Sequence, residues 1–315
     1  MTDMTLIAHG DSAQSASNIR RRVVLAEVAG FCFGVRRAVE MTEAYRREHA
    51  GRVTTLGPII HNEQVIARMR EEGVETSAEL ETIREGTVVL SAHGVAPAVV
   101  AQARKQGLRM LDVTCPFVTK VHLRAKMLHE QGYQVLLVGD RGHTEVKGVV
   151  GAVEALGGRV TVVTQPEEIA EFAIGKKVGV ISQTTQYSSN FAAIVAEVSK
   201  IAVEVRAFNT VCNATDELQD AAIRMAQQVE VALVVGGKKS ANTRRLRELC
   251  AAEGIPAYHI ETAAEIEPEW LEGHEVIGIT GGASTPDWIL EEVARCINGG
   301  ELPTDWRMHH PDECA

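Results

Sequence analysis

Residues 23–32 read VVLAEVAGFC, a short apolar run that ends in a cysteine. The same pattern returns twice along the chain, as LRMLDVTC at residues 108–115 and as VRAFNTVC at residues 205–212. Each cysteine is followed by apolar residues three or four positions apart, which is the spacing of an amphipathic helix. Each copy therefore predicts a strand that leads through a cysteine into a helix.

Two more patterns also occur three times. In one, a strand meets a glycine and then a polar cluster, and in the other a strand runs into small polar residues. The first set is residues 54–65, 135–148 and 232–246, and the second set is residues 88–97, 178–187 and 276–287. Together these patterns predict three copies of a β-α-β-α-β unit, about 85–95 residues each, with mostly parallel sheets.

Three such α/β units arranged around an axis would aim the polar strand ends at one central cavity, because ligands of open α/β sheets gather beyond the carboxyl ends of the strands. Three stacked α/β layers with unrelated loops are the alternative. The expected division is a flexible N-terminal extension at 1–22, α/β domains at 23–115, 116–211 and 212–300, and a C-terminal tail at 301–315.

Composition excludes several classes of protein. The 315 residues are 45% hydrophobic with a net charge of −10, which is ordinary for a globular protein and argues against a nucleic-acid binder. No run of 18 apolar residues predicts a membrane span, and the first residues lack the apolar core of a secretory signal. We therefore expect a cytoplasmic protein with reduced thiols and no membrane partner.

The chain has six cysteines. Three of them end the repeated strands, whereas Cys250 and Cys296 fall on apolar helix stripes and are expected in the core. Cys314 lies in the expected tail. The three repeat cysteines are Cys32, Cys115 and Cys212.

The repeat cysteines have no CxxC-type spacing, but equivalent positions around an axis would bring them together. Each precedes a helix N-terminus, where the helix dipole favours a thiolate. Three thiolates without an obvious fourth ligand suit an iron–sulfur cluster with one open iron, which could bind a substrate oxygen and deliver electrons. A zinc site and three simply buried thiols are the alternatives.

Polar residues at the other strand ends predict an anion pocket and a proton source. Imidazoles, hydroxyls and an amide at helix starts can donate hydrogen bonds to a diphosphate, with positive character from any protonated histidine. Glu145 beside such a pocket is expected to have a raised pKa and to act as an acid, with Thr184 or Thr185 orienting the proton path. The expected anion ligands are His61, His93, His143, Ser240, Asn242 and Ser284.

Six motifs follow one another along the chain: AGFCFGV, SAHGV, DVTCPFVTKVH, GHTEVKG, SQTT and TVCNAT. In this order they resemble the LytB family of 4-hydroxy-3-methylbut-2-enyl diphosphate reductases, from residue 23 to about residue 300. The resemblance implies a trefoil of three α/β domains around one 4Fe–4S cluster. The reaction it implies is reduction of that allylic diphosphate to isopentenyl and dimethylallyl diphosphates, with two electrons, two protons and loss of water. This is the last step of the non-mevalonate isoprenoid pathway, with an electron donor such as ferredoxin or flavodoxin.

The resemblance also implies roles for single residues. The substrate hydroxyl would take the open iron, Thr184 would lie beside it, and Glu145 would donate a proton. The family commonly has SSN where this chain has Ser240-Ala241-Asn242. One hydroxyl is therefore missing, and weaker binding of the diphosphate is expected. The implied cluster ligands are Cys32, Cys115 and Cys212, and the implied diphosphate ligands are His61, His93, His143, Ser240, Asn242 and Ser284.

Two other functions fit parts of this pattern. A non-catalytic iron–sulfur protein that senses redox state or carries electrons would need the three cysteines, but neither Glu145 nor the anion pocket. An α/β module that only binds a phosphorylated metabolite would need the pocket but no metal.

Overall fold

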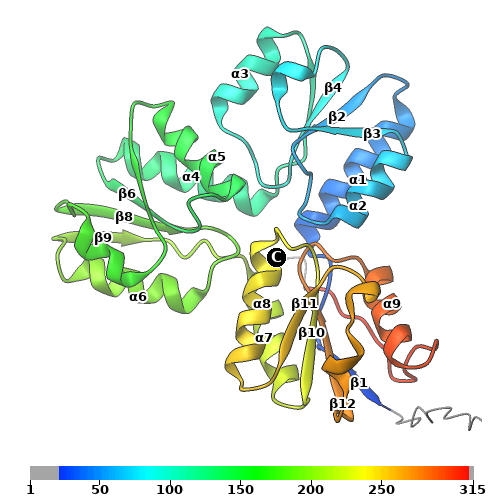
Figure 1. The fold of residues 1–315 in the computed structure, drawn as a ribbon. Helices are drawn as coiled ribbons and strands as arrows, with labels where there is room; N and C mark the ends of the chain where they lie inside the picture. The colour runs from blue at the N-terminus through cyan, green and yellow to red at the C-terminus, as the bar shows by residue number, and fades with distance from the viewer. Residues whose placement is uncertain (1–20, 312–315) are drawn as a thin grey trace, which may run out of the picture.

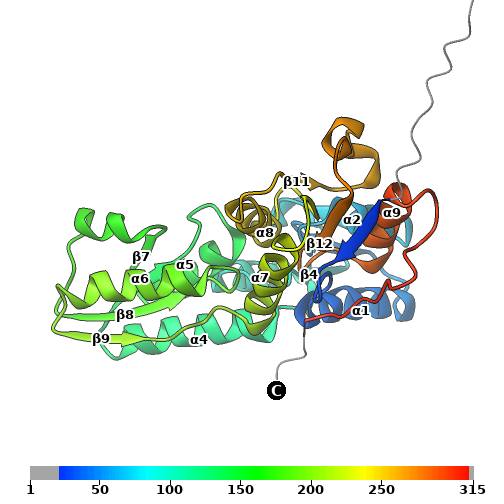
Figure 2. The ribbon, with the colours of Figure 1, turned by 90° about the horizontal axis from the view of Figure 1, so that it is seen from below.

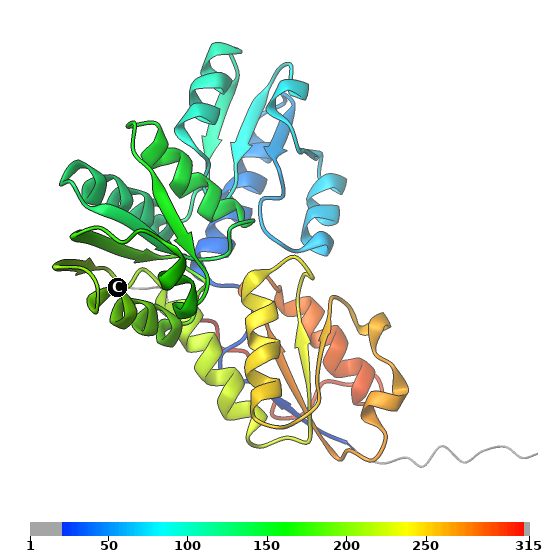
Figure 3. The same cartoon turned by 60° about the vertical axis from the view of Figure 1, so that its left-hand side comes forward.

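The computed structural model describes residues 21–311. Its strands form three four-stranded sheets, in which every strand pair is parallel. Helices flank the sheets, and the three units meet at the middle of the molecule (Figure 1, Figure 3). The predicted α/β fold of three similar units around a centre is therefore confirmed.

The first sheet has the strand order β3-β2-β4-β5. Its strands are β2 (Val53–Leu56), β3 (Val74–Ser77), β4 (Thr87–Leu90) and β5 (Arg109–Asp112). The helices of this unit are α1 (Phe33–Glu48), α2 (Glu63–Glu71), the 3-10 helix η1 (Leu80–Thr82) and α3 (Pro97–Lys105).

The second sheet repeats this order as β7-β6-β8-β9. Its strands are β6 (Gln134–Val138), β7 (Val160–Val163), β8 (Lys177–Ser182) and β9 (Glu204–Ala207). The helices are α4 (Pro116–Glu130), α5 (Thr144–Glu154), η2 (Pro166–Glu171) and α6 (Ser188–Ser199).

The third sheet has the order β11-β10-β12-β1, so its last strand comes from the start of the chain. Its strands are β10 (Val231–Val235), β11 (Ala257–Ile260), β12 (Val276–Gly281) and β1 (Arg22–Leu25). The helices are α7 (Asn213–Ala226), α8 (Ala241–Ala252), η3 (Ala263–Glu265), η4 (Pro268–Leu271) and α9 (Asp287–Ile297).

The position of β1 corrects one expectation. The sequence pattern assigns this strand to the first unit at residues 23–115, but it pairs with β12, with Val23 opposite Ile277 (Figure 2). Val23 is buried in the core of the third unit, where Ile279 also lies. An apolar run predicts a strand from local pattern alone, whereas its partner strand depends on contacts far along the chain. The boundaries at residues 115/116 and 211/212 remain a prediction.

The middle strands of the sheets are buried on both faces, as parallel sheets covered by helices require. All five residues of β10, VALVV, are buried, and so are four of the five in β6, QVLLV. These rigid strands hold the loops at their carboxyl ends in fixed positions, and those loops carry the candidate site.

We expect Leu137→Ala in β6 to lower the free energy of unfolding of that unit by about 2–5 kcal/mol, because it leaves a cavity in a packed core. Leu137 is 0% exposed, whereas Leu123 in α4 is 60% exposed. Leu123→Ala is the matched control and should change stability by less than about 0.5 kcal/mol. Thermal unfolding of both variants, followed by circular dichroism, checks this. Equal losses in the two variants would contradict the burial of Leu137.

Candidate functional site

All three repeat cysteines occupy the same structural position. Cys32, Cys115 and Cys212 are the N-cap residues of α1, α4 and α7, each with extended backbone and no side-chain capping hydrogen bond. Each lies in the linker that leaves the edge strand of one sheet and enters the next unit. The three linkers meet at the centre, so the three thiols line one cavity, although they are far apart in sequence.

The raised pKa values of the buried thiols show that their charged form is unfavourable without a cation. Burial raises the pKa of Cys32 to about 11, and a charge on Cys115 would raise it further. Burial likewise raises the pKa of Cys212 far above its usual value, with the charges of Cys32 and Cys115 adding to the effect. Three buried thiolates that repel one another are unfavourable alone, whereas a bound metal cation reverses the balance and deprotonates coordinating thiols. The donor set therefore fits a metal group.

The distance between ligand atoms decides whether a group of side chains can hold a single zinc ion. Zinc–sulfur bonds of about 2.3 Å place the sulfurs of a tetrahedral site about 3.8 Å apart. Within residues 21–311, one group of three or more side chains is compact enough to hold a single ion, because its ligand atoms lie within 4.8 Å of one another. This group consists of three histidines and contains none of the three cysteines. In the described residues the three cysteines therefore do not form a compact single-ion site of the zinc type.

A glycine leaves room beside the sulfurs. A Cβ atom built on Gly34, in the first turn of α1, would lie 2.5 Å from the Sγ atom of Cys115. Real Cβ atoms do not approach that closely, so any larger residue would displace the thiol. Gly34 thus keeps space for Cys115 in the linker.

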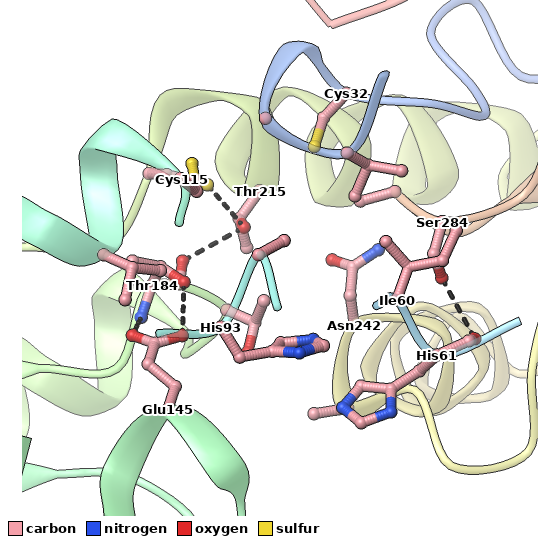
Figure 4. A pocket seen from close by; sticks show the side chains of 18 of the residues that line it. Cys32, Ile60, His61, His93, Cys115, Glu145, Thr184, Thr215, Asn242 and Ser284 are labelled. Atoms are coloured by element: carbon pink, nitrogen blue, oxygen red, sulfur yellow. Dashed lines mark hydrogen bonds between the residues drawn. The ribbon is translucent and has the colours of Figure 1, made fainter. Parts of the chain in front are cut away.

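The compact histidine group consists of His61, His93 and His143. Their ring centroids are 4.2, 5.4 and 5.6 Å apart, and each histidine lies in the loop after a strand of the first or second sheet. Figure 4 shows the rings of His61 and His93 side by side. Burial lowers the pKa of all three, to about 4 for His143 and well below the usual value for His93. The expected positive charge is therefore absent at neutral pH in the ligand-free protein, and the rings act as neutral donors. Both ring nitrogens of His61 and the Nδ1 atom of His93 are buried without a partner in the described residues.

The third unit adds an amide and two hydroxyls to this side of the cavity. Ser240 caps α8 by accepting a hydrogen bond from the Thr243 N–H, and Ser284 Oγ donates to the backbone oxygen of His61 at 3.2 Å. Asn242 is 3% exposed, and neither its Oδ1 nor its Nδ2 atom has a partner among residues 21–311. A buried amide without partners is costly, so a polar ligand at this position would supply what it lacks. Ala241 also lines the cavity.

Helix N-termini converge on this side as well. His143 and Ser240 are the N-cap residues of α5 and α8, and Asn62, next to His61, caps α2. Each of the three units contributes one helix start. Their free N–H groups and dipoles make this side of the cavity favourable for an anion.

Glu145, two residues after His143 in α5, lines the same cavity as the histidines and the cysteines. It is 2% exposed, and its two carboxyl oxygens accept hydrogen bonds from Thr184 N at 2.8 Å and Thr184 Oγ1 at 2.7 Å (Figure 4). Burial raises the pKa of this carboxyl from 4.5 to about 7, although the two hydrogen bonds from Thr184 oppose the rise. The group can therefore exchange a proton near neutral pH, which is the property of a general acid.

The structure places every predicted site residue on one cavity, whose free space including its open mouth is about 680 Å³. The roles of these residues remain predictions. The residues brought together are Cys32, His61, His93, Cys115, His143, Glu145, Thr184, Cys212, Ser240, Asn242 and Ser284.

This geometry can be compared with known proteins. The model of the LytB protein family matches residues 23–298. The chain belongs to this family. Relatives named 4-hydroxy-3-methylbut-2-enyl diphosphate reductase come from Pelobacter propionicus and Aquifex aeolicus. They are 46% and 44% identical over 273 and 272 residues, which is 86% of this chain and 96% and 94% of the relatives.

Two solved structures share the fold. One is (E)-4-hydroxy-3-methyl-but-2-enyl diphosphate reductase, the terminal enzyme of the non-mevalonate pathway; it aligns with a TM-score of 0.65 at 42% identity, over 89% of this chain and 99% of that chain. The other is E-1-hydroxy-2-methyl-but-2-enyl-4-diphosphate reductase from Plasmodium falciparum, with a TM-score of 0.82 at 25% identity, over 94% and 93% of the two chains. The resemblance read from the six motifs is confirmed over nearly the whole chain.

Sequence reasoning missed Thr215, which lines the cavity, and Arg245, whose charge acts on His143 and Glu145. Thr215, three positions after Cys212, lies 3.0 Å from its Sγ atom and donates to the Thr184 backbone oxygen at 3.1 Å. Arg245, three positions after Asn242 in α8, is 4% exposed and pairs with Asp140 at 2.9 Å. The i+3 spacing on a helix could have indicated both, since such residues share a face.

The remaining cysteines behave differently. Cys250 is buried in the core of the third unit, as expected. The prediction for Cys296 is wrong, because this side chain is exposed. The buried face of α9 is formed by Ile289, Val293 and their neighbours, and Cys296 lies off that face. Cys314 falls outside the described residues.

Among residues 21–311, no helix combines the length and apolar character that crossing a bilayer would need.

We expect the Glu145 carboxyl to titrate with a midpoint near pH 7, because its burial penalises the charged form. It is protonated below that pH and ionised above it, so its contribution to folding stability falls as the pH rises from 4.5 towards 7. Infrared difference spectra against pH should show the protonated-carboxyl band, and Glu145→Gln should lose it. A midpoint near 4.5, as in a solvated glutamate, would contradict the assignment.

Proposed function

We propose that the protein reduces 4-hydroxy-3-methylbut-2-enyl diphosphate to isopentenyl and dimethylallyl diphosphates. Two electrons and two protons are consumed, the C–O bond to the hydroxyl breaks, and water leaves. The observation that supports this most directly is the single cavity, which combines three converging thiols, an anion pocket and a buried carboxyl that titrates near neutral pH. Relatives that match most of the chain carry the same activity in their names.

The cofactor in this proposal is one 4Fe–4S cluster held by the thiolates of Cys32, Cys115 and Cys212. When bound, such a cluster supplies electrons and, at its iron without a protein ligand, a Lewis-acid site for the substrate hydroxyl. The three helix N-termini behind the cysteines stabilise the thiolates. A cytoplasmic location remains a prediction, since these thiols must stay reduced.

The diphosphate would be held by the histidine group together with Ser240, Asn242 and Ser284. Neutral imidazoles donate one N–H each, and the partnerless amide of Asn242 gains the hydrogen bonds that it lacks. The negative charge of the ligand would also raise the lowered pKa values of the histidines and favour their protonation. Ala241 has no hydroxyl to donate, which supports the expectation that the diphosphate binds more weakly.

Glu145 would supply a proton to the reacting end of the substrate. Its pKa of about 7 leaves a substantial share of the carboxyl protonated at neutral pH, and Thr184 orients the group with two hydrogen bonds. After the proton has left, those same hydrogen bonds stabilise the carboxylate that remains. Thr184 is also placed to orient the substrate hydroxyl, because it lines the same cavity.

The test is an assay of the anaerobically purified protein with reduced methyl viologen and the allylic diphosphate. Products identified as the two five-carbon diphosphates support the proposal. A brown protein that forms no product would favour the redox sensor or electron carrier, and a colourless protein that binds the diphosphate would favour the metabolite-binding module.

Glu145→Gln is expected to keep the cluster and bind the substrate but to lower kcat by about 10²–10⁴-fold, because a positioned general acid contributes that much. Glu154→Gln, at the exposed end of the same helix, is the matched control and should turn over normally. Steady-state kinetics with reduced viologen measure both. A near-normal kcat in Glu145→Gln would remove the proton-donor role.

Gly34→Ala is expected to lower the amount of cluster per chain, because the added methyl group would occupy the space of the Cys115 sulfur. Gly142→Ala is the control, since a Cβ there meets no atom within 4 Å. Iron and sulfide analysis with visible spectra measures cluster loading. Full loading of Gly34→Ala would contradict the packing of Gly34 against Cys115.

A further inference from the structure

One face of the molecule lies directly outside the Cys115 linker. The helices α1 and α4 run along this face, on the opposite side of the molecule from α2 and α8 (Figure 2). The linker itself reaches the surface, because Pro116, next to Cys115, is exposed and so is Thr119 one turn later. Leu123 follows on the same helix with 60% of its side chain exposed.

Two adjoining hollows mark this face, and cations line both. Arg37 and Lys120 line the first hollow, and Arg104 and Lys126 line the second, while Leu123 borders both. We call these five residues the cationic face. Within residues 21–311, none of its four cations forms an ion pair.

The acidic groups around the face do not cancel its charge. Asp112 is the one carboxylate that lines the two hollows, and it accepts hydrogen bonds from Thr114 N and Thr114 Oγ1. By contrast, Lys238 and Lys239, beside the histidine group, pair with Glu265 and Glu63. In a chain with a net charge of −10, two adjoining hollows lined by four cations and one carboxylate form a local region of positive charge.

A hydrogen bond joins the cationic face to the linker that carries Cys115. Arg37 Nη1 donates to the backbone oxygen of Thr114 at 3.2 Å, which ties α1 to the Cys115 linker. The face is thus the surface near one proposed cluster ligand, while the anion pocket opens among the histidines.

We propose that the cationic face docks the electron donor, a small acidic protein that carries one electron at a time on an iron–sulfur cluster. This inference rests on the proposed function. Two donor molecules in turn each lose one electron, and the two electrons with two protons reduce one substrate and release one water. Substrate can remain in the pocket during both transfers, because the donor binds elsewhere.

Charge complementarity argues for this occupant. Opposite charges steer a transient redox encounter and speed association, and exposed Leu123 adds an apolar contact at its centre. Such encounters bury little surface and release quickly, which two successive deliveries require. Binding should weaken as salt screens the charges.

The test uses the holoenzyme with Lys120→Glu and Lys126→Glu combined. The matched control combines Lys176→Glu and Lys200→Glu, which change the net charge equally on residues that line neither hollow. The probe is an acidic [2Fe–2S] ferredoxin. Its binding in the oxidised state is measured by calorimetry at low and high salt, and turnover is measured with reduced ferredoxin and, separately, with reduced methyl viologen.

We expect the Lys120/Lys126 variant to bind ferredoxin about tenfold more weakly or worse, with a flatter salt dependence, and to lose ferredoxin-driven turnover. Viologen-driven turnover should stay within about twofold, because a small cation needs no cationic face. Unchanged ferredoxin binding, or equal weakening in the control variant, would overturn the docking proposal. Absence of viologen-driven turnover in the unmodified protein would instead count against the proposed function, and calorimetry would still decide the docking site.

Discussion

Mutual repulsion of three buried thiolates is the constraint on which the rest of the structure depends. Burial raises the pKa of all three cysteines, and the charge of Cys115 adds to the rise for both Cys32 and Cys212. Without a ligand the thiols therefore stay protonated at neutral pH, and a bound metal cation would be needed to make three thiolates favourable. The fold places each cysteine in a linker between units, so the loops that join the sheets would also build the proposed metal site. Removing one linker from the centre would therefore disturb two units as well as one ligand.

Helix starts divide the cavity into two chemical halves. The helices α1, α4 and α7 begin at the cysteines, whereas α2, α5 and α8 begin beside the anion pocket. Figure 2 shows α1 and α4 on one side of the molecule and α2, α5 and α8 towards the other. A threefold repeat thus supplies the positive ends of three helix dipoles to each half. In the proposed function, electrons and substrate would then reach the cavity from different sides.

Much of this could be predicted from sequence, because the repeat makes equivalent positions visible. The three cysteine-terminated strands and the polar strand ends are sufficient to predict one shared cavity. What the repeat could not show was the sheet to which β1 belongs, since pairing of Val23 with Ile277 joins opposite ends of the chain. Nor could it show that the histidines are neutral, because their lowered pKa values follow from burial and from nearby charges. Arg245 and Thr215 were missed because they have no counterpart in the repeat.

Charge in the ligand-free cavity is arranged to change when substrate arrives. The histidines are neutral and Glu145 is half protonated near pH 7, so the pocket carries little net charge of its own. In the proposed function, a bound diphosphate would raise the pKa of the groups around it, which would favour protonation of the histidines and of Glu145. Buried Arg245, paired with Asp140, works in the opposite direction and lowers the pKa values of both His143 and Glu145. If Glu145 donates the proton as proposed, the substrate's charge would favour the protonated carboxyl, while the charge of Arg245 would favour release of the proton.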